Sequence, residues 1–289
     1  MKLKLACCQF APAWREPQRN MELADLLLKR YTPGDMDVLV LPEMAFTGYC
    51  FKSAEDVHPF AEDRTMGKTV RWAVNQAIRL NAFVMVGYPE IVYAGPDEPP
   101  AYYNSACLVD RQGKVVTTYQ KTFLYEVDEA WAQEGPGFKS MYIEGLGQVG
   151  FGICMDLNPY QFKTSFHDFE FAKFHMEQNT ELLLCCMAWV GSKGESEEKH
   201  MSTIEYWAMR MSPMLDRKPR SKQPTIFVAS NRHGLEEGKL EPFFTTCGVT
   251  YAGASCVMRL GPPRPVLLDC FDSSDTGVLI VETDVGNGQ

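Results

Sequence analysis

Short apolar runs alternate with longer mixed segments along the chain, and this pattern predicts most of its secondary structure. Continuous apolar runs, typical of strands buried on both faces, lie at 38–41, 83–88, 149–153 and 182–187. Helices are expected at 21–31, 68–80, 166–178 and 201–215. The remaining strands are expected at 2–10, 102–110, 114–120, 225–230, 248–250, 255–260, 266–270 and 277–282.

The order of these elements predicts an α/β fold. Strands alternate with helices in the first ninety residues, as in βαβ units with right-handed crossovers, whereas 102–110 and 114–120 form a hairpin around Gly113. This mixture favours two mixed sheets packed face to face with helices outside, a four-layer α-β-β-α sandwich. No Pro/Gly/Ser-rich or charged linker divides the sequence, so we expect residues 1–289 to form a single domain.

Composition narrows the class of protein. The 28 basic and 37 acidic residues give a net charge of −9, which argues against binding to nucleic acid or an anionic membrane. The ten cysteines follow no disulfide spacing, the N-terminus lacks a signal-peptide pattern, and the longest apolar run, 182–190, is too short to span a bilayer. We therefore expect a cytoplasmic protein, in which the charged segment 191–199 forms a surface loop.

Cys154 stands out because it follows the strand at 149–153, just before Asn158 and Pro159 turn the chain away. A thiol at such a turn is typical of a nucleophile elbow, with backbone N–H groups beside it. The alternative is that Cys154 is a small buried apolar residue, as free cysteines often are.

Two further polar residues, like Cys154, lie just past the end of a predicted strand. Glu43 follows the strand at 38–41, and Lys121 follows the hairpin strand at 114–120. In open α/β sheets, ligands bind beyond the carboxyl ends of strands. Taken singly, such a glutamate is usually a charge at a helix N-terminus, and such a lysine is usually solvated. Together with Cys154 they supply a base, a cation for an oxyanion and a nucleophile, which is what amide cleavage through a thiol requires.

The three residues lie in segments that resemble the motifs of the nitrilase, or carbon–nitrogen hydrolase, superfamily. These segments are LPEMAFTGY at 41–49, YQKTFL at 119–124 and GICMD at 152–156. The resemblance implies a catalytic triad of Glu43, Lys121 and Cys154, and it implies that Glu129 is a second active-site acid that orients the substrate or shares the proton. Histidines fall at no metal-ligand spacing and no Gly-rich phosphate loop follows a strand, so we expect neither metal nor cofactor.

Within that superfamily, KTFLYEVDEAW at 121–131 and GICMDLNPY at 152–160 resemble the eukaryotic branch that acts on N-terminal asparagine and glutamine. This implies that the substrate is the N-terminal Asn or Gln of a protein or peptide. Deamidation would release ammonia and create a destabilising residue of the N-degron pathway, through a thioester on the cysteine. Superfamily members often pair through the helices that cover the sheets, so a homodimer is one of the oligomeric states that stay open.

One departure concerns the substrate pocket. Many superfamily members carry an arginine two residues after the acid that follows the cysteine, and this chain has Asn158 there. We therefore hypothesise that Asp156, or another free carboxylate near it, receives the substrate's α-ammonium. The alternatives are that it caps the elbow turn or pairs with Arg232. Met155, Asn158, Tyr49 and Trp189 are expected to complete the pocket.

Two competing functions stay open. One is a superfamily amidase that acts on a small free ω-amide, a carbamoyl compound or a nitrile. The other is a catalytically idle protein that recognises N-terminal residues. A small-amide hydrolase would act on free Asn or Gln but not on peptides that begin with them, which separates it from an N-terminal amidase. Labelling of Cys154 by a reactive amide analogue would argue against the idle binding protein.

Overall fold

The structure is a computed structural model of the 289-residue chain, and it describes residues 1–95, 98–191, 199–215, 224–237 and 248–286. The strands are β1 (Lys2–Gln9), β2 (Val38–Val40), β3 (Phe83–Val92), β4 (Ala101–Val109), β5 (Val115–Gln120), β6 (Lys139–Ile143), β7 (Gly147–Ile153), β8 (Leu182–Met187), β9 (Thr225–Asn231), β10 (His233–Glu236), β11 (Val249–Ala252), β12 (Cys256–Leu260), β13 (Val266–Cys270) and β14 (Gly277–Asp284). The α-helices are α1 (Pro17–Leu28), α2 (Ala54–Val57), α3 (Lys68–Leu80), α4 (Glu170–Glu177) and α5 (Lys199–Arg210). Short 3-10 helices include η2 (Asp128–Ala130), η3 (Cys154–Leu157), η4 (Tyr160–Phe162) and η5 (Ser212–Leu215).

Two six-stranded sheets of similar design form the centre of the molecule. The first has the order β14-β1-β2-β3-β4-β5, and the second has the order β13-β12-β9-β8-β7-β6. In each sheet three neighbouring strands run parallel, β1–β3 in one and β7–β9 in the other, and antiparallel strands flank them. A two-stranded ribbon, β10-β11, lies beside them.

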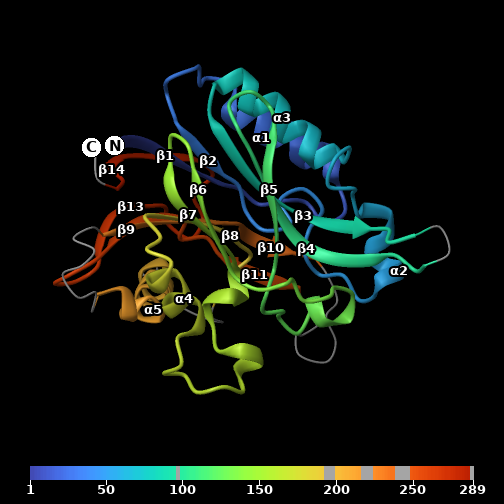
Figure 1. Ribbon diagram of the computed structural model, residues 1–289. Helices are drawn as coiled ribbons and strands as arrows, with labels where there is room; N and C mark the ends of the chain where they lie inside the picture. The colour runs from blue at the N-terminus through green and yellow to red at the C-terminus, as the bar shows by residue number, and fades with distance from the viewer. Residues whose placement is uncertain (96–97, 192–198, 216–223, 238–247, 287–289) are drawn as a thin grey trace.

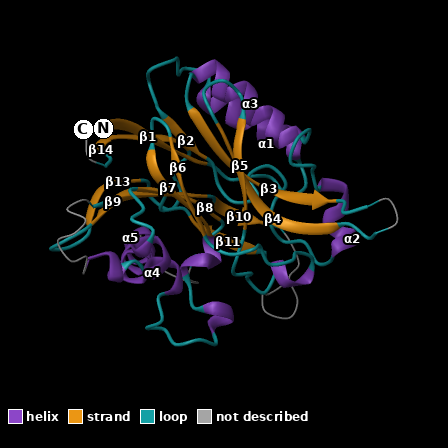
Figure 2. Cartoon of the chain, in the orientation of Figure 1, coloured by secondary structure: helices purple, strands orange, loops and turns teal. Residues whose placement is uncertain are grey.

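Helices cover the outer faces of both sheets, with α1 and α3 on the first and α4 and α5 on the second (Figure 1; Figure 2). Side chains along β1 alternate between the two faces of the first sheet, and both faces pack against a neighbouring layer. Leu5 and Cys7 pack between the sheets, whereas Ala6 and Cys8 face the core beneath α1 and α3. All four side chains are fully buried, so both faces of the strand contribute to the hydrophobic stabilisation of the fold. The four-layer sandwich predicted from the sequence is confirmed.

Several element boundaries differ from the expectation. Helix α1 begins at Pro17, whose fixed φ suits the first helical position. Helix α4 begins only at Glu170, because Phe169 before it is left-handed, with φ 49°. Strands β6 and β10 were not expected. In β6 only Ile143 is buried, so this edge strand lacks the apolar alternation by which a strand is found.

No helix in the described part of the chain is long and apolar enough to cross a membrane. The loop expected at 191–199 lies largely outside the described residues, which resume at Lys199.

The ends of the parallel strands determine where the chemistry lies. Glu43 is the third residue after β2, and its N–H donates to the carbonyl of Met187, the last residue of β8, at 3.2 Å. That hydrogen bond joins the carboxyl ends of strands from the two sheets. The candidate site lies at this end of the sandwich, where Lys121 leaves β5 and Cys154 leaves β7.

Candidate active site

Glu43 is completely buried, and a glycine on the neighbouring strand makes room for it. A Cβ at Gly87 of β3 would lie 2.7 Å from the Glu43 Cα, so any larger residue there would displace the backbone. The turn after β2 continues through Met44, which has a left-handed φ of 49°. The strand end therefore delivers the carboxylate into the interior rather than to solvent.

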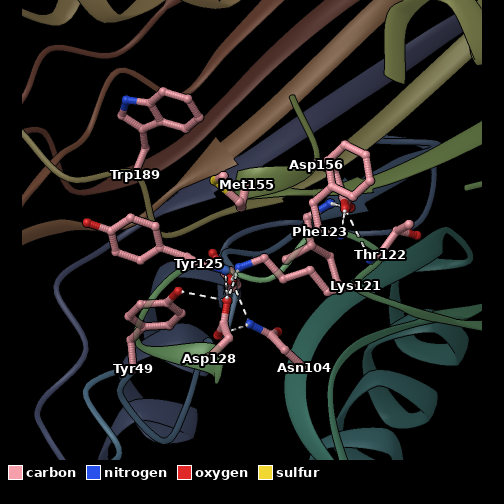
Figure 3. Close-up of polar contacts among 12 residues, drawn as sticks. Tyr49, Asn104, Lys121, Thr122, Phe123, Tyr125, Asp128, Met155, Asp156 and Trp189 are labelled. Carbon is pink, nitrogen blue, oxygen red and sulfur yellow. Dashed lines mark hydrogen bonds and ion pairs between the residues drawn. The ribbon is translucent and has the colours of Figure 1, made fainter. Parts of the chain in front are cut away.

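Lys121 is also buried, and two carboxylates share its ammonium group (Figure 3). Its Nζ lies 2.7 Å from Glu43 Oε1 and 2.5 Å from Asp128 Oδ2. Asn104 bridges the same two acids, since its Nδ2 donates to Glu43 Oε1 at 2.6 Å and to Asp128 Oδ1 at 3.0 Å. The Tyr49 hydroxyl donates to Asp128 Oδ2 at 3.0 Å. One cation and two acids thus form a single hydrogen-bonded cluster.

Asp128, which the sequence analysis missed, occupies the place expected for Glu129. Both lie in η2, and a 3-10 helix has three residues per turn, so neighbouring side chains point about 120° apart. Only one of them can face Lys121. Asp128 is fully buried, whereas Glu129 is exposed and accepts a hydrogen bond from Gln161 Nε2 at 3.2 Å. The structure therefore does not bring Glu129 into the cluster.

The charges in the cluster perturb one another. Burial alone would lower the pKa of Lys121, but the charges of Asp128 and Glu43 outweigh it and raise that pKa, so the lysine is an ammonium ion. Burial raises the pKa of Glu43, and the charge of Asp128 adds to this effect while Lys121 opposes it. Glu43 Oε2 has no hydrogen-bond partner in the described chain. This oxygen is the one available to accept a proton.

Cys154 stands at the turn between β7 and η3 in a strained conformation. Its φ of 42° is left-handed, which is rare for a residue with a side chain and is typical of a nucleophile elbow. Burial raises the pKa of the thiol well above its usual value, and Glu43 raises it further while Lys121 lowers it. The resting residue is therefore a thiol rather than a thiolate, and it needs a base to become a nucleophile.

A cavity of about 180 Å³ opens onto this thiol. Its described lining is Tyr49, Tyr125, Cys154, Met155, Asn158, Phe162, Ala188, Trp189 and Val190. The four expected pocket residues Tyr49, Met155, Asn158 and Trp189 are among them. Tyr125, Phe162, Ala188 and Val190 were not expected, although Ala188 and Val190 flank Trp189 in an apolar run.

Asp156 does not line this cavity. Its Oδ1 accepts from the N–H groups of Thr122 and Phe123 (Figure 3). Its Oδ2 accepts from the Ile153 N–H and the Tyr119 hydroxyl. The geometry is that of a capped elbow turn, and it leaves no room for the ammonium ion that we hypothesised. The alternative partner, Arg232, pairs instead with Glu236.

A second cavity is larger, about 600 Å³, but it lies away from these groups. It is lined by the turn at 110–114, which precedes β5, and by residues 141–145, which precede β7. Lys121 and Cys154 follow the opposite ends of those two strands. The smaller cavity is therefore the one associated with the thiol.

Comparison with known proteins matches residues 4–162 to the carbon–nitrogen hydrolase family. The chain belongs to this family. It is 29% identical over 301 positions to the protein N-terminal amidase of Schizosaccharomyces pombe, a match that covers 98% of this chain and 100% of that protein. It is 31% identical over 200 positions to the protein N-terminal amidase of Saccharomyces cerevisiae, covering 63% of this chain and 43% of that relative.

The fold of this carbon–nitrogen hydrolase is shared with solved structures. Crystal structures of an N-terminal amidase with an Asn-Glu-Ala peptide and with a Gln-Gly peptide match it with TM-scores of 0.81 and 0.80. The sequence identity is 21%, and the match covers 98% of this chain and 97% of theirs. The superfamily resemblance seen in the three motifs is thus confirmed. The prediction that the protein is an enzyme acting on carbon–nitrogen bonds other than peptide bonds is confirmed as well.

Proposed function

We propose that this carbon–nitrogen hydrolase is a protein N-terminal amidase that converts the side-chain amide of N-terminal Asn or Gln to the acid and releases ammonia. The observation that carries the proposal is a thiol at the cavity whose pKa is raised by burial and by the charge of Glu43 and lowered by that of Lys121, where Glu43 is buried with one unpartnered oxygen and pairs with the lysine ammonium. The two N-terminal amidase relatives support the choice of substrate.

In the first half-reaction, Glu43 takes the proton of the Cys154 thiol through Oε2, and the sulfur attacks the carboxamide carbon. The carbonyl oxygen becomes an oxyanion, which the Lys121 ammonium and the Met155 backbone N–H stabilise. When the C–N bond breaks, the proton held by Glu43 passes to the leaving nitrogen and ammonia departs. The acyl group is then bound to Cys154 as a thioester.

In the second half-reaction, a water molecule enters where ammonia left. Glu43 accepts its proton, the hydroxide attacks the thioester carbon, and the second tetrahedral intermediate uses the same oxyanion site. Its collapse returns the proton from Glu43 to sulfur and releases the new carboxylic acid. Asp128 keeps Lys121 charged through both halves, because its carboxylate raises the pKa of the ammonium.

Selectivity for an N-terminal residue follows from what lines the cavity. None of its described lining residues is a lysine or an arginine, so the described lining offers no cation for the α-carboxylate of free Asn or Gln. The rings of Tyr125, Phe162 and Trp189 can instead receive an α-ammonium by cation–π contact. The Asn158 side-chain oxygen accepts from the Tyr206 hydroxyl at 2.7 Å and retains a second lone pair for the same group.

Mass spectrometry of synthetic peptides tests the proposal. Peptides that begin with Asn or Gln, each with a free or an acetylated N-terminus, are incubated with wild type, Cys154→Ala and the control Cys270→Ser, which alters a half-buried thiol outside the cavity. We expect the free-amine peptides to gain the mass of one amide-to-acid conversion when they are incubated with wild type or Cys270→Ser. The acetylated peptides, and all peptides incubated with Cys154→Ala, should keep their mass. Conversion of free Asn or Gln but of no peptide would point to a small-amide hydrolase. Tight peptide binding without conversion or labelling of Cys154 would point to an idle binding protein.

A further inference from the structure

Asp156 joins the two segments that carry the lysine and the nucleophile. Its Oδ1 accepts from the N–H groups of Thr122 at 3.1 Å and Phe123 at 2.8 Å, directly after Lys121. Its Oδ2 accepts from the Ile153 N–H at 2.8 Å, directly before the nucleophile. The Tyr119 hydroxyl, two residues before Lys121, donates to the same Oδ2 at 2.8 Å.

These bonds cross from one sheet to the other. Lys121 follows β5, the edge strand of the first sheet, while Ile153 ends β7 of the second. In the described chain, the hydrogen bonds between residues 119–123 and residues 153–156 all end on the Asp156 carboxylate. Asp156 is therefore the side chain through which hydrogen bonds tie the segment of the oxyanion cation to the segment of the sulfur.

The nucleophile has a particular need for such support. The left-handed φ of Cys154 is a strained conformation, which persists only when the surroundings hold it in place. Fixing the Ile153 N–H holds the residue before the strained one. Asp156 is itself fully buried and its oxygens are occupied by four donors, so it has neither the exposure nor the free lone pairs to bind substrate.

We propose that Asp156 is a positioning residue, which sets the placement of Lys121 relative to Cys154 through Tyr119, Thr122, Phe123 and Ile153. It acts in the reaction of the proposed amidase without touching the substrate. A carboxylate serves better than an amide there, because all four partners are donors and an amide nitrogen would face one of them.

The test compares Asp156→Asn with Tyr119→Phe. Misplacement of reacting groups by about 1 Å can cost on the order of 100-fold in rate, so we expect Asp156→Asn to lower kcat by about that factor with KM within about threefold of wild type. Tyr119→Phe removes one of four donors and leaves the three backbone bonds, so a loss of about threefold to tenfold in kcat is expected. The graded pair keeps the test informative if Asp156→Asn does not fold.

A second readout does not depend on the substrate. Alkylation of Cys154 by iodoacetamide, followed against pH by mass spectrometry, reports how well Glu43 and Lys121 activate the thiol. In both variants the alkylation profile should move to higher pH, by more in Asp156→Asn. An unchanged alkylation profile and unchanged kcat in a folded Asp156→Asn protein would overturn the proposal. A raised KM with unchanged kcat would also overturn it and return Asp156 to substrate binding. Failure of the amidase proposal alone would leave the alkylation shift intact.

Discussion

Two buried glutamates in this molecule are bonded in opposite ways. Glu236 receives the N–H groups of Tyr49 and Cys50 at 3.0 and 2.9 Å on Oε1, and its Oε2 pairs with Arg232. Glu43 receives Asn104 and Lys121 on Oε1 alone, and its Oε2 has no partner in the described chain. A buried acceptor without a donor costs free energy. Glu236 therefore serves the fold, whereas we propose that Glu43 keeps one oxygen for chemistry at a cost to stability.

The largest effect on activity is expected when Glu43 loses its charge. Glu43→Gln retains the shape but cannot take the thiol proton, so kcat/KM should fall by about a thousandfold. The free energy of unfolding should not fall, because Lys121 keeps Asp128 as its anionic partner and a glutamine oxygen in place of Oε1 still accepts from Asn104 and Lys121. Ammonia release and urea titration measure the two quantities. A destabilised protein with intact kcat/KM would reverse the roles that we assign to the two glutamates.

Glu236→Gln should show the complementary pattern. Arg232 would remain buried without a negative partner, a situation that typically lowers the free energy of unfolding by about 3 kcal/mol. The folded fraction should keep kcat within about tenfold of wild type, since the loop that carries Tyr49 still has an acceptor in the glutamine oxygen. Urea titration gives the stability, and kcat is measured well below the unfolding midpoint. A loss of activity as large as in Glu43→Gln would contradict the contrast.

The smallest of the three expected effects is that of a substitution at Asp128, and it distinguishes this acid from its neighbour Glu129 in η2. Asp128→Asn should lower kcat/KM by about tenfold, because Lys121 loses one of its two carboxylates. The negative charge of Asp128 helps to raise the pKa of Glu43, so its removal lowers that pKa. Since Glu43 must be ionised to act as base, the acidic limb of the pH profile of kcat/KM should move to lower pH.

Glu129→Gln is the matched control for that variant. The side chain is exposed and touches Gln161, so kcat/KM should stay within about twofold of wild type and the acidic limb should not move. If Glu129→Gln lowered the activity and Asp128→Asn did not, the family-based expectation for Glu129 would be restored.

Much of the site could be predicted because it follows strand ends. Glu43, Lys121 and Cys154 each come one to three residues after a strand, and in open α/β sheets sites form beyond the carboxyl ends of the strands. Strand β6 could not be predicted in the same way, since its residues are half-exposed and show no alternation. The exposed Glu129 and the buried Asp128 are adjacent acids, and nothing in their order distinguishes them.

The sequence by itself determined the α/β class, the strand ends that carry the glutamate, lysine and cysteine, and the family to which the chain belongs. These depend on apolar periodicity and on local motifs, which are properties of short segments. Only the tertiary structure decided that Asp128 rather than Glu129 meets Lys121, and that Asp156 joins the lysine and cysteine segments instead of facing the cavity. The reason is that a side chain's direction depends on the rotation of its turn, and a carboxylate's role depends on which donors from distant segments reach it.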